Sequence, residues 1–229
     1  MEKAQKPHRR QGEEAAPPRF GDLLTETRHP ASEALDTLPT EDLVGLLLEE
    51  DRRGLDAALR HRAAIAEVAG WVADALAAGG DVVFAGAGTS GRLGVLEAAE
   101  CPPTFGTDPQ RIRAFMAGGE EAVFRAREGA EDRGEDGRRA VRGLGSGDLL
   151  IALSASSVTP FARGALAAAR AQGARTVLLT CAAPEGLGGR ADRVLALETG
   201  PEILTGSTRL KAGSATKAVL NAITTTAAP

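Results

Sequence analysis

One junction in this sequence, from an apolar run through a glycine-rich turn into a helix, constrains the fold more than any other feature. Residues 82–85 are uniformly apolar, which is typical of a buried strand. Residues 86–91 then hold three glycines and two hydroxyl residues, and a helix is predicted from about Ser90 to Glu100. Backbone N–H groups at a helix start stabilise an anion. The junction therefore predicts a strand–turn–helix unit with an anion site at its turn.

The same alternation of apolar runs and helical periodicity continues along the chain. Further strands are predicted at 111–116, 149–153, 176–180 and 193–197, and helices at 42–58, 61–78 and 160–172. Thr40 is the expected N-cap of the first helix, and two glycines at 79–80 end the second. Such alternation indicates βαβ units and a mainly parallel sheet, with right-handed connections and a ligand crevice at the carboxyl ends of the strands.

A second hydroxyl-rich turn follows the predicted strand at 149–153. Ser154, Ser156, Ser157 and Thr159 lie within six residues, directly before Pro160 at the expected helix start. A helix N-cap requires only one hydroxyl, so four favour a bound oxyanion, such as a phosphate. A helix cap with surplus hydroxyls stays open as the alternative.

The spacing of Gly86, Gly88 and Gly91 also fits the dinucleotide-binding fingerprint. That fingerprint expects an acidic residue at the end of the second strand, about 20 residues further on. The nearest candidate is Asp108, which lies in a segment with the composition of a loop. Nucleotide binding and a purely structural glycine turn are the alternatives to a phosphorylated small molecule.

Carboxylates and a third hydroxyl cluster complete the set of candidate site residues. Glu100 ends the helix that follows the first turn, and Glu128 and Glu131 are expected on one face of a helix that opens after two glycines at 118–119. Two carboxylates in different environments can divide acid and base roles. Residues 205–213 are rich in hydroxyls and carry two cations, and residues 132–147 are expected to form a solvated loop or a frayed helix.

Composition excludes several classes of protein. The chain has 229 residues, 3% aromatic residues and a formal net charge of −4, which argues against a nucleic-acid binder. Cys101 and Cys181 are too few for a disulfide framework or a zinc cluster, so we expect two reduced thiols in a cytosolic protein without a metal. No apolar stretch approaches the length of a membrane span, and residues 1–22 are expected to be a disordered extension without a secretory signal. His29 and His61 are expected to be structural or surface residues.

Four co-linear motifs, at 86–94, 99–106, 128–132 and 205–213, resemble those of the N-acetylmuramic acid 6-phosphate etherases. The segment at 25–30 and Leu35-Asp36 fit the same family, and the resemblance covers about residues 23–222. It implies an α/β fold of the three-layer sugar isomerase (SIS) type, a mainly parallel sheet flanked by helices, with an N-terminal helical segment. It also implies a cytoplasmic lyase that cleaves the D-lactyl ether of N-acetylmuramic acid 6-phosphate. Elimination across C2–C3 of the open-chain sugar and addition of water would give N-acetylglucosamine 6-phosphate and D-lactate, without a cofactor.

The resemblance also implies roles for individual residues. Glu100 would be the acid that protonates the departing lactate, and Glu131 the base that removes the C2 proton. The phosphate would be held by hydroxyl residues of the first two turns, and weaker candidates for sugar contacts lie near the third cluster. The phosphate set is Thr89, Ser90, Ser154, Ser156 and Thr159, and the sugar set is Glu202, Ser207 and Lys211.

This chain departs from the family pattern in two places. Ser157 stands where the family has a glycine and Val158 where it has an arginine, which would lower phosphate affinity or activity. One SIS domain is expected over residues 23–229, without the small helical C-terminal domain of the family, and the family implies a homodimer. The alternatives are a non-catalytic sugar-phosphate regulator that resembles the glucokinase regulatory protein, a truncated inactive copy, and an aldose–ketose isomerase on the same fold.

Overall fold

The computed structural model describes residues 26–184 and 189–228, and the extension predicted for residues 1–22 lies outside them. Five parallel strands form one sheet in the order β2-β1-β3-β4-β5. They are β1 (Val82–Gly86), β2 (Ile112–Met116), β3 (Leu149–Leu153), β4 (Arg175–Thr180) and β5 (Arg193–Ala196). All five strands agree with the predictions to within a residue or two, because strands covered on both faces have continuous apolar runs.

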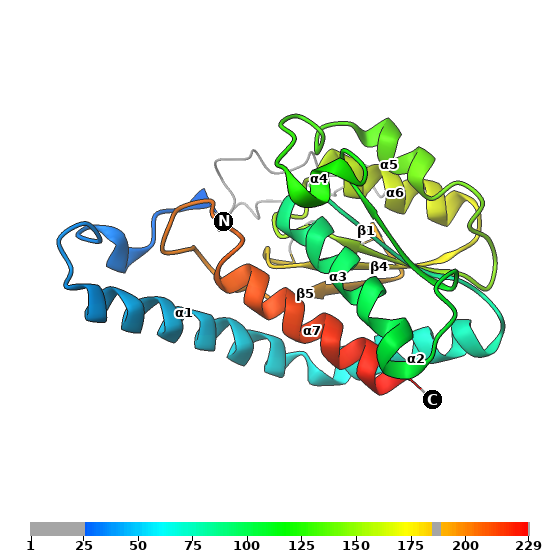
Figure 1. The fold of residues 1–229 in the computed structure, drawn as a ribbon, viewed down its shortest axis with the longest axis horizontal. Coiled ribbons are helices and arrows are strands. Elements are labelled where there is room, and N and C mark those ends of the chain that lie inside the picture. The colour runs from blue at the N-terminus through cyan, green and yellow to red at the C-terminus, as the bar shows by residue number, and fades with distance from the viewer. Residues whose placement is uncertain (1–25, 185–188, 229) are drawn as a thin grey trace, which may run out of the picture.

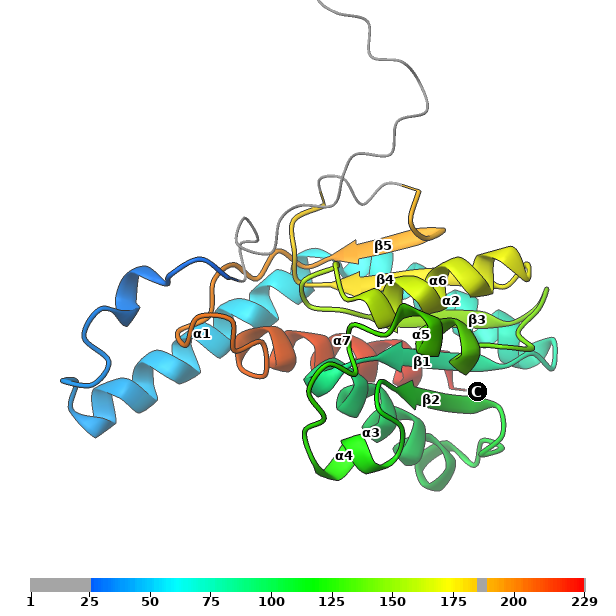
Figure 2. The ribbon, with the colours of Figure 1, turned by 90° about the horizontal axis from the view of Figure 1, so that it is seen from above.

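Helices cover both faces of the sheet and make a three-layer α/β fold (Figures 1 and 2). One face packs against α2 (Arg62–Ala77), α3 (Gly88–Phe105) and α7 (Lys211–Ala227), where Phe84, Ile151 and Leu220 are fully buried. The other face packs against α5 (Gly134–Ala140) and α6 (Pro160–Ala171), where Leu150 and Phe161 are buried. Each side of the sheet therefore has its own apolar layer.

The N-terminal helical segment packs outside this sandwich. A short 3-10 helix (Pro30–Ser32) precedes α1 (Thr40–Arg60), which packs along α7 and extends past the carboxyl ends of the strands (Figure 1). Thr40 is the first helical residue of α1 and not its N-cap, because Pro39 takes the cap position and no side chain caps this end. The cap prediction was therefore wrong, although the helix itself was predicted correctly.

Two predictions between β1 and β3 were also wrong. α3 continues through Pro102 and Pro103 to Phe105 and does not end at Glu100, and it stops only where Gly106 adopts a left-handed φ of 69°. α4 spans only Glu121–Phe124, so it does not extend to residues 128–131.

The segment expected to be a solvated loop or a frayed helix contains α5, a helix of seven residues that packs tightly against α6. A Cβ atom at Gly137 would lie 2.0 Å from the carbonyl oxygen of Phe161, and one at Gly164 would lie 2.0 Å from that of Gly134. The backbones of the two helices are therefore in direct contact. This contact is not evident from the sequence, because α5 also carries charged residues that lie on the surface.

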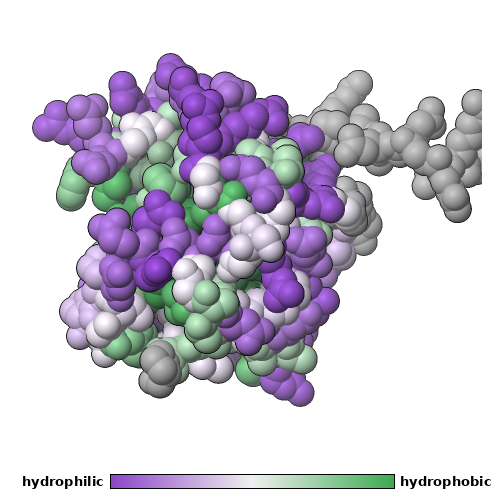
Figure 3. Space-filling view, turned by 90° about the vertical axis from the view of Figure 1, so that its right-hand side faces the viewer, coloured by the Kyte–Doolittle hydropathy of each residue, from purple (hydrophilic) through white to green (hydrophobic). Residues whose placement is uncertain are grey.

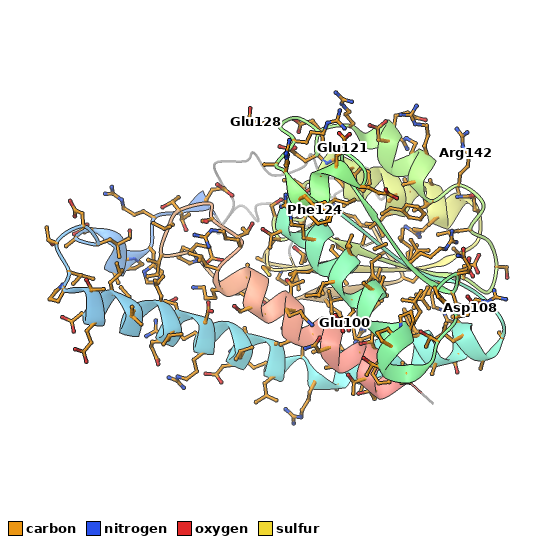
Figure 4. All side chains as sticks on the ribbon, in the orientation of Figure 1. Glu100, Asp108, Glu121, Phe124, Glu128 and Arg142 are labelled. Carbon is orange, nitrogen blue, oxygen red and sulfur yellow. The ribbon has the colours of Figure 1, made fainter. Side chains whose placement is uncertain are left out.

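The opposite face of the molecule, at the amino ends of the strands, is mainly hydrophilic. Figure 3 views this side and shows polar residues around small separate apolar spots. Exposed side chains such as Asp108 and Arg142 lie at this end (Figure 4). Among the described helices, none combines the length and the apolar character needed to cross a membrane.

Candidate active site

A cavity of about 560 Å³ opens at the carboxyl ends of β1, β2 and β3. β1 lies between β2 and β3, so the connections leave β1 and β3 toward opposite faces of the sheet. Open parallel sheets bind their ligands at such a switch point. The cavity is lined by the turns that follow these three strands, by Glu26 at the start of the described chain, and by Gly206 and Thr208 before α7.

The first wall of the cavity is the start of α3, where Thr89 and Ser90 lie as predicted. Ala87 occupies the N-cap position without a side-chain hydrogen bond to the helix, so no cap takes up the first N–H groups of α3. A Cβ atom at Gly91 would lie 2.7 Å from the carbonyl oxygen of Gly86, which explains the glycines at both positions. This helix start therefore presents hydroxyls and backbone donors to an anion.

The second wall is the serine-rich turn after β3. Ser156 and Thr159 line the cavity, and buried Ser154 lies behind them with its Oγ 2.8 Å from Oγ1 of Thr159. Thr159 is at the N-cap position of α6 but makes no side-chain hydrogen bond to the helix. The hydroxyls of this turn therefore do not cap the helix. This favours an oxyanion-binding turn over the alternative of a helix cap with surplus hydroxyls.

The third wall is the segment after β2, which carries the predicted base. Glu131 lines the cavity together with Glu128 and Asp132. Glu128 and Glu131 lie in turns, so the predicted shared helix face was wrong. The carbonyl oxygen of Glu131 accepts a hydrogen bond of 2.9 Å from the backbone N–H of Phe161, which fixes the base beside the start of α6.

Arg92 joins the first wall to the third. Its side chain lines the cavity from α3, with Nε 2.8 Å from the carbonyl oxygen of Val123 and Nη2 2.8 Å from that of Ala122. These two hydrogen bonds hold the end of α4 against the start of α3. Arg92 was not among the site residues predicted from the sequence, although it stands within the glycine motif.

The structure does not bring Glu100 to this cavity. Its side chain is exposed on the far half of α3 and is absent from the lining (Figure 4). Ten residues separate it from Ser90, which is about 15 Å along a helix. α3 begins at the cavity and runs away from it, so Glu100, near the other end of the helix, lies outside the cavity that its own chain forms.

Glu202 and Lys211 also lie away from the cavity, in a buried ionic network. The Glu202 carboxylate accepts hydrogen bonds from the backbone N–H groups of Lys211 (3.2 Å) and Ala212 (2.8 Å), and so caps α7. Lys211 Nζ lies 2.6 Å from Oε2 of Glu50 and 2.7 Å from the carbonyl oxygen of Pro201. Glu202 and Lys211, two of the three predicted sugar contacts, therefore bond to structural partners.

The electrostatics of this network are set by burial and pairing. Burial raises the pKa of Glu202, against the lowering effect of its backbone hydrogen bonds and of Lys211. Burial also opposes ionisation of Glu50, but the hydrogen bond and charge of Lys211, with His29 and Arg53, outweigh it and lower the pKa of this carboxyl. His29 is a structural residue, as expected, since its Nε2 lies 3.2 Å from Oε2 of Glu50.

The fourth wall of the cavity comes from segments that flank this network. Glu26, Gly206 and Thr208 line it, whereas predicted Ser207 does not. Sequence reasoning missed Glu26 and Thr208, although both stand inside motifs that carry the family resemblance. Their position within these motifs was the only indication, and the sequence alone does not show that the two residues lie at the same cavity.

The dinucleotide alternative loses its key residue in the structure. Asp108 precedes β2 and therefore lies at the amino edge of the sheet, opposite the cavity (Figure 4). The positions at the carboxyl end of β2 are Met116, Ala117 and Gly118, none of which is acidic. The ribose contact that this fingerprint requires is missing at that position.

The fold and the cavity define a protein of the SIS class, and comparisons with known proteins agree. Residues 64–170 match the model for the N-terminal SIS domain of the glucokinase regulatory protein. A phosphoheptose isomerase from Francisella tularensis aligns with a TM-score of 0.63 at 15% identity, covering 83% of this chain and 99% of the isomerase. The Vibrio vulnificus NanR protein, solved as a complex with ManNAc-6P, aligns with a TM-score of 0.55 at 16% identity over 82% of this chain and 62% of NanR.

Sequence comparison then identifies the particular family. N-acetylmuramic acid 6-phosphate etherase from Synechococcus elongatus is 49% identical over 207 residues, which are 90% of this chain and 67% of that enzyme. Those of Thermosynechococcus vestitus (48%; 91% and 68%) and Cutibacterium acnes (47%; 88% and 67%) are similarly close. The chain belongs to the N-acetylmuramic acid 6-phosphate etherase family and spans about two thirds of the length of these relatives.

Proposed function

We propose that this protein is a lyase that releases D-lactate from N-acetylmuramic acid 6-phosphate and leaves N-acetylglucosamine 6-phosphate. The single observation that carries this proposal is the cavity at the switch point, which combines an anion-binding helix start with the carboxylate of Glu131. Relatives at 45–49% identity over about 90% of the chain are etherases. The fold therefore supports a binding site at this cavity, and the motifs shared with the etherases support the reaction.

The phosphate is proposed to lie between the first two walls of the cavity. Thr89 and Ser90 donate from α3, and Ser156 and Thr159 donate from the turn before α6, while Ser154 orients Thr159. Helix starts and hydroxyls stabilise a phosphate by direct hydrogen bonds and by the positive end of the helix dipole. This arrangement leaves the sugar carbons to extend toward the third wall.

Glu131 is proposed to remove the C2 proton of the open-chain sugar. Its backbone is fixed on Phe161, next to the phosphate-binding turn, so a bound phosphate orients the sugar relative to this carboxylate. The electrons of the C2–H bond form the C2–C3 double bond, and the C3–O bond breaks to release lactate. Water then adds back, with its oxygen at C3 and a proton at C2.

The acid that protonates the departing lactate remains a prediction for Glu100. This residue is outside the cavity that Glu131 lines, so its assignment rests on the family motif alone. The cytoplasmic location and the homodimer that the resemblance implies are likewise predictions.

A lactate-release assay tests the proposal directly. Wild-type protein should release D-lactate from N-acetylmuramic acid 6-phosphate, and product formed in D₂O should carry deuterium at C2. Glu131→Gln should slow release by about 100-fold or more, because general-base catalysis is typically worth that much. Glu135→Gln, an exposed change on α5, should leave the rate unchanged.

Two outcomes would overturn parts of the proposal. Tight binding of amino-sugar phosphates without lactate release would select the regulator that shares the SIS fold. Normal release by Glu100→Gln would remove Glu100 from the mechanism, while leaving the reaction and the role of Glu131 intact.

A further inference from the structure

The described N-terminal residues bring into the cavity a carboxylate that has no role in the proposed reaction. Glu26 is half-buried and lines the cavity together with Thr89 and Ser156. It belongs to a segment more than 60 residues away in sequence from the start of α3. Its presence there depends on the tertiary structure.

The carboxylate of Glu26 packs directly on the backbone of Gly206. A Cβ atom at Gly206 would lie 2.9 Å from Oε2 of Glu26, closer than real Cβ contacts, so the carboxylate would have to shift away. Gly206 has a left-handed φ of 74° and lines the same cavity. The glycine therefore leaves the space that the carboxylate occupies at the cavity wall.

Buried contacts fix the segment that carries Glu26. His29, three residues further on, contacts Glu50, and Glu50 pairs with Lys211, whose Nζ also bonds the carbonyl oxygen of Pro201. All three side chains are at most 7% exposed. The same network thus holds both segments of the fourth wall, the one with Glu26 and the one with Gly206 (Figure 1).

The charge of Glu26 determines which part of a ligand it can contact. A carboxylate accepts hydrogen bonds and repels anions, so it cannot bind a phosphate or the lactyl carboxylate. A phosphorylated amino sugar offers hydroxyl groups and an amide N–H as donors. Hydrogen bonds from such donors to a charged acceptor are stronger than those between neutral groups.

We propose that Glu26 is a specificity-determining residue that binds the hydroxyl or acetamido donors of the sugar while the helix start of α3 holds the phosphate. This inference rests on the proposed function, because it takes a phosphorylated amino sugar as the ligand. It assigns recognition of the sugar, as distinct from its phosphate, to the N-terminal segment.

Calorimetry with two probes tests the inference separately from the reaction. Glu26→Gln should weaken binding of N-acetylglucosamine 6-phosphate about tenfold or more, because a charge-assisted hydrogen bond is lost. Binding of inorganic phosphate should stay the same or tighten, since a nearby negative charge is removed. Glu33→Gln, an exposed change on the same segment, should alter neither affinity.

A second route displaces Glu26 without changing it. Gly206→Ala places a methyl group against the carboxylate and should reproduce the selective loss of sugar-phosphate binding. Gly200→Ala is the matched control, because its φ of 75° imposes the same backbone strain and a Cβ there meets nothing within 4 Å. Thermal unfolding of all four variants verifies that they are folded.

The outcomes are distinguishable. Equal loss of both ligands in Glu26→Gln, or unchanged sugar-phosphate affinity, would overturn the role of Glu26. Absence of lactate release by the wild-type protein would overturn the proposed reaction, and the two-probe comparison would still decide the role of Glu26. In an active enzyme, Glu26→Gln should raise KM more than it lowers kcat.

Discussion

Ser157 adopts a left-handed backbone conformation, which glycine takes readily and residues with a side chain usually avoid. Its φ is 66°, and its carbonyl oxygen accepts a hydrogen bond of 3.3 Å from Arg190. The family resemblance implies a glycine at this position, and Ser157 adopts the left-handed conformation that favours glycine. The serine therefore carries local backbone strain, and its effect on phosphate binding stays a prediction.

Ser157→Gly should stabilise the protein by about 1 kcal/mol, the typical cost of a left-handed L-residue. The denaturation midpoint in urea measures this change. Ser146→Gly is the control, since Ser146 is exposed and has no left-handed φ, and it should not stabilise. An equal gain at both positions would show that the strain at Ser157 is not the cause.

Glu202 and Lys211 show why residue types alone do not identify ligand contacts. The sequence places a carboxylate, hydroxyls and cations together, which is the composition of a binding site. The structure buries both charges and pairs them with a helix start, a carbonyl group and Glu50. The packing of α1 against α7 buries these charges, and it brings together Glu50 and Lys211, which are 161 residues apart in sequence. No local sequence pattern indicates such a contact.

At the scale of elements, the ion pair between Glu50 and Lys211 fastens α1 to the start of α7. Glu50→Gln would leave a buried ammonium without its charge partner and should destabilise the protein by about 3 kcal/mol or more. Glu49→Gln removes an exposed pair with Arg52 and should have little effect. Denaturant unfolding at neutral pH compares the two, and equal effects would contradict a special role for the buried pair.

The same pair predicts how stability depends on pH. The pKa of Glu50 is lowered in the folded chain, so its contribution is complete above the ordinary pKa of a glutamate and disappears as the pH falls through the lowered value. Glu50→Gln should therefore lose less stability than the wild type over that acidic interval. Parallel curves for the two proteins would contradict this assignment.

Arg92 connects α3, which carries the proposed phosphate site, to the end of α4, in the segment that leads to the proposed base Glu131. Arg92→Lys keeps the charge but cannot donate to both carbonyl groups at the end of α4. We expect kcat/KM for lactate release to fall about tenfold, as for the loss of one to two hydrogen bonds. Arg125→Lys, at the exposed residue that follows α4, should leave the rate unchanged.

The five strands could be predicted from the sequence because their packing requires apolar residues. The close contact between α5 and α6 could not, because it is made by backbone atoms and glycines. The five strands are apolar throughout because helices cover both sides, and this pattern is visible in one sequence. For the segment with α5, the sequence left a loop and a frayed helix open, because its contact with α6 needs only glycine while its surface carries arginines and acids. Residues of the two hydroxyl-rich turns and Glu131 line one cavity, since strand ends in a parallel sheet share one edge, and their roles there stay predictions.

At the scale of the whole molecule, the two thiols report on global unfolding. Burial raises the pKa of both Cys101 and Cys181 from 9.0 to about 11. Such a shift reduces the reactive thiolate fraction about 100-fold near neutral pH. Native protein should therefore react with maleimide at least that much more slowly than in denaturant. Rapid labelling under native conditions would contradict the burial of these side chains.

The glycines between α5 and α6 have a consequence for mutational data on this chain. Gly134, Gly137 and Gly164 touch backbone atoms of the opposite segment, and the same junction holds Glu131 in place through Phe161. A Cβ atom at Gly137 or Gly164 would lie 2.0 Å from a carbonyl oxygen, so any side chain at either position would force the two segments apart and Glu131 with them, whereas at Gly134 the separation is 3.2 Å and a smaller shift suffices. A saturation scan scored only for activity would therefore rank Gly137 and Gly164 beside Glu131, the proposed base. Separating the two kinds of position would require abundance to be scored in the same cells.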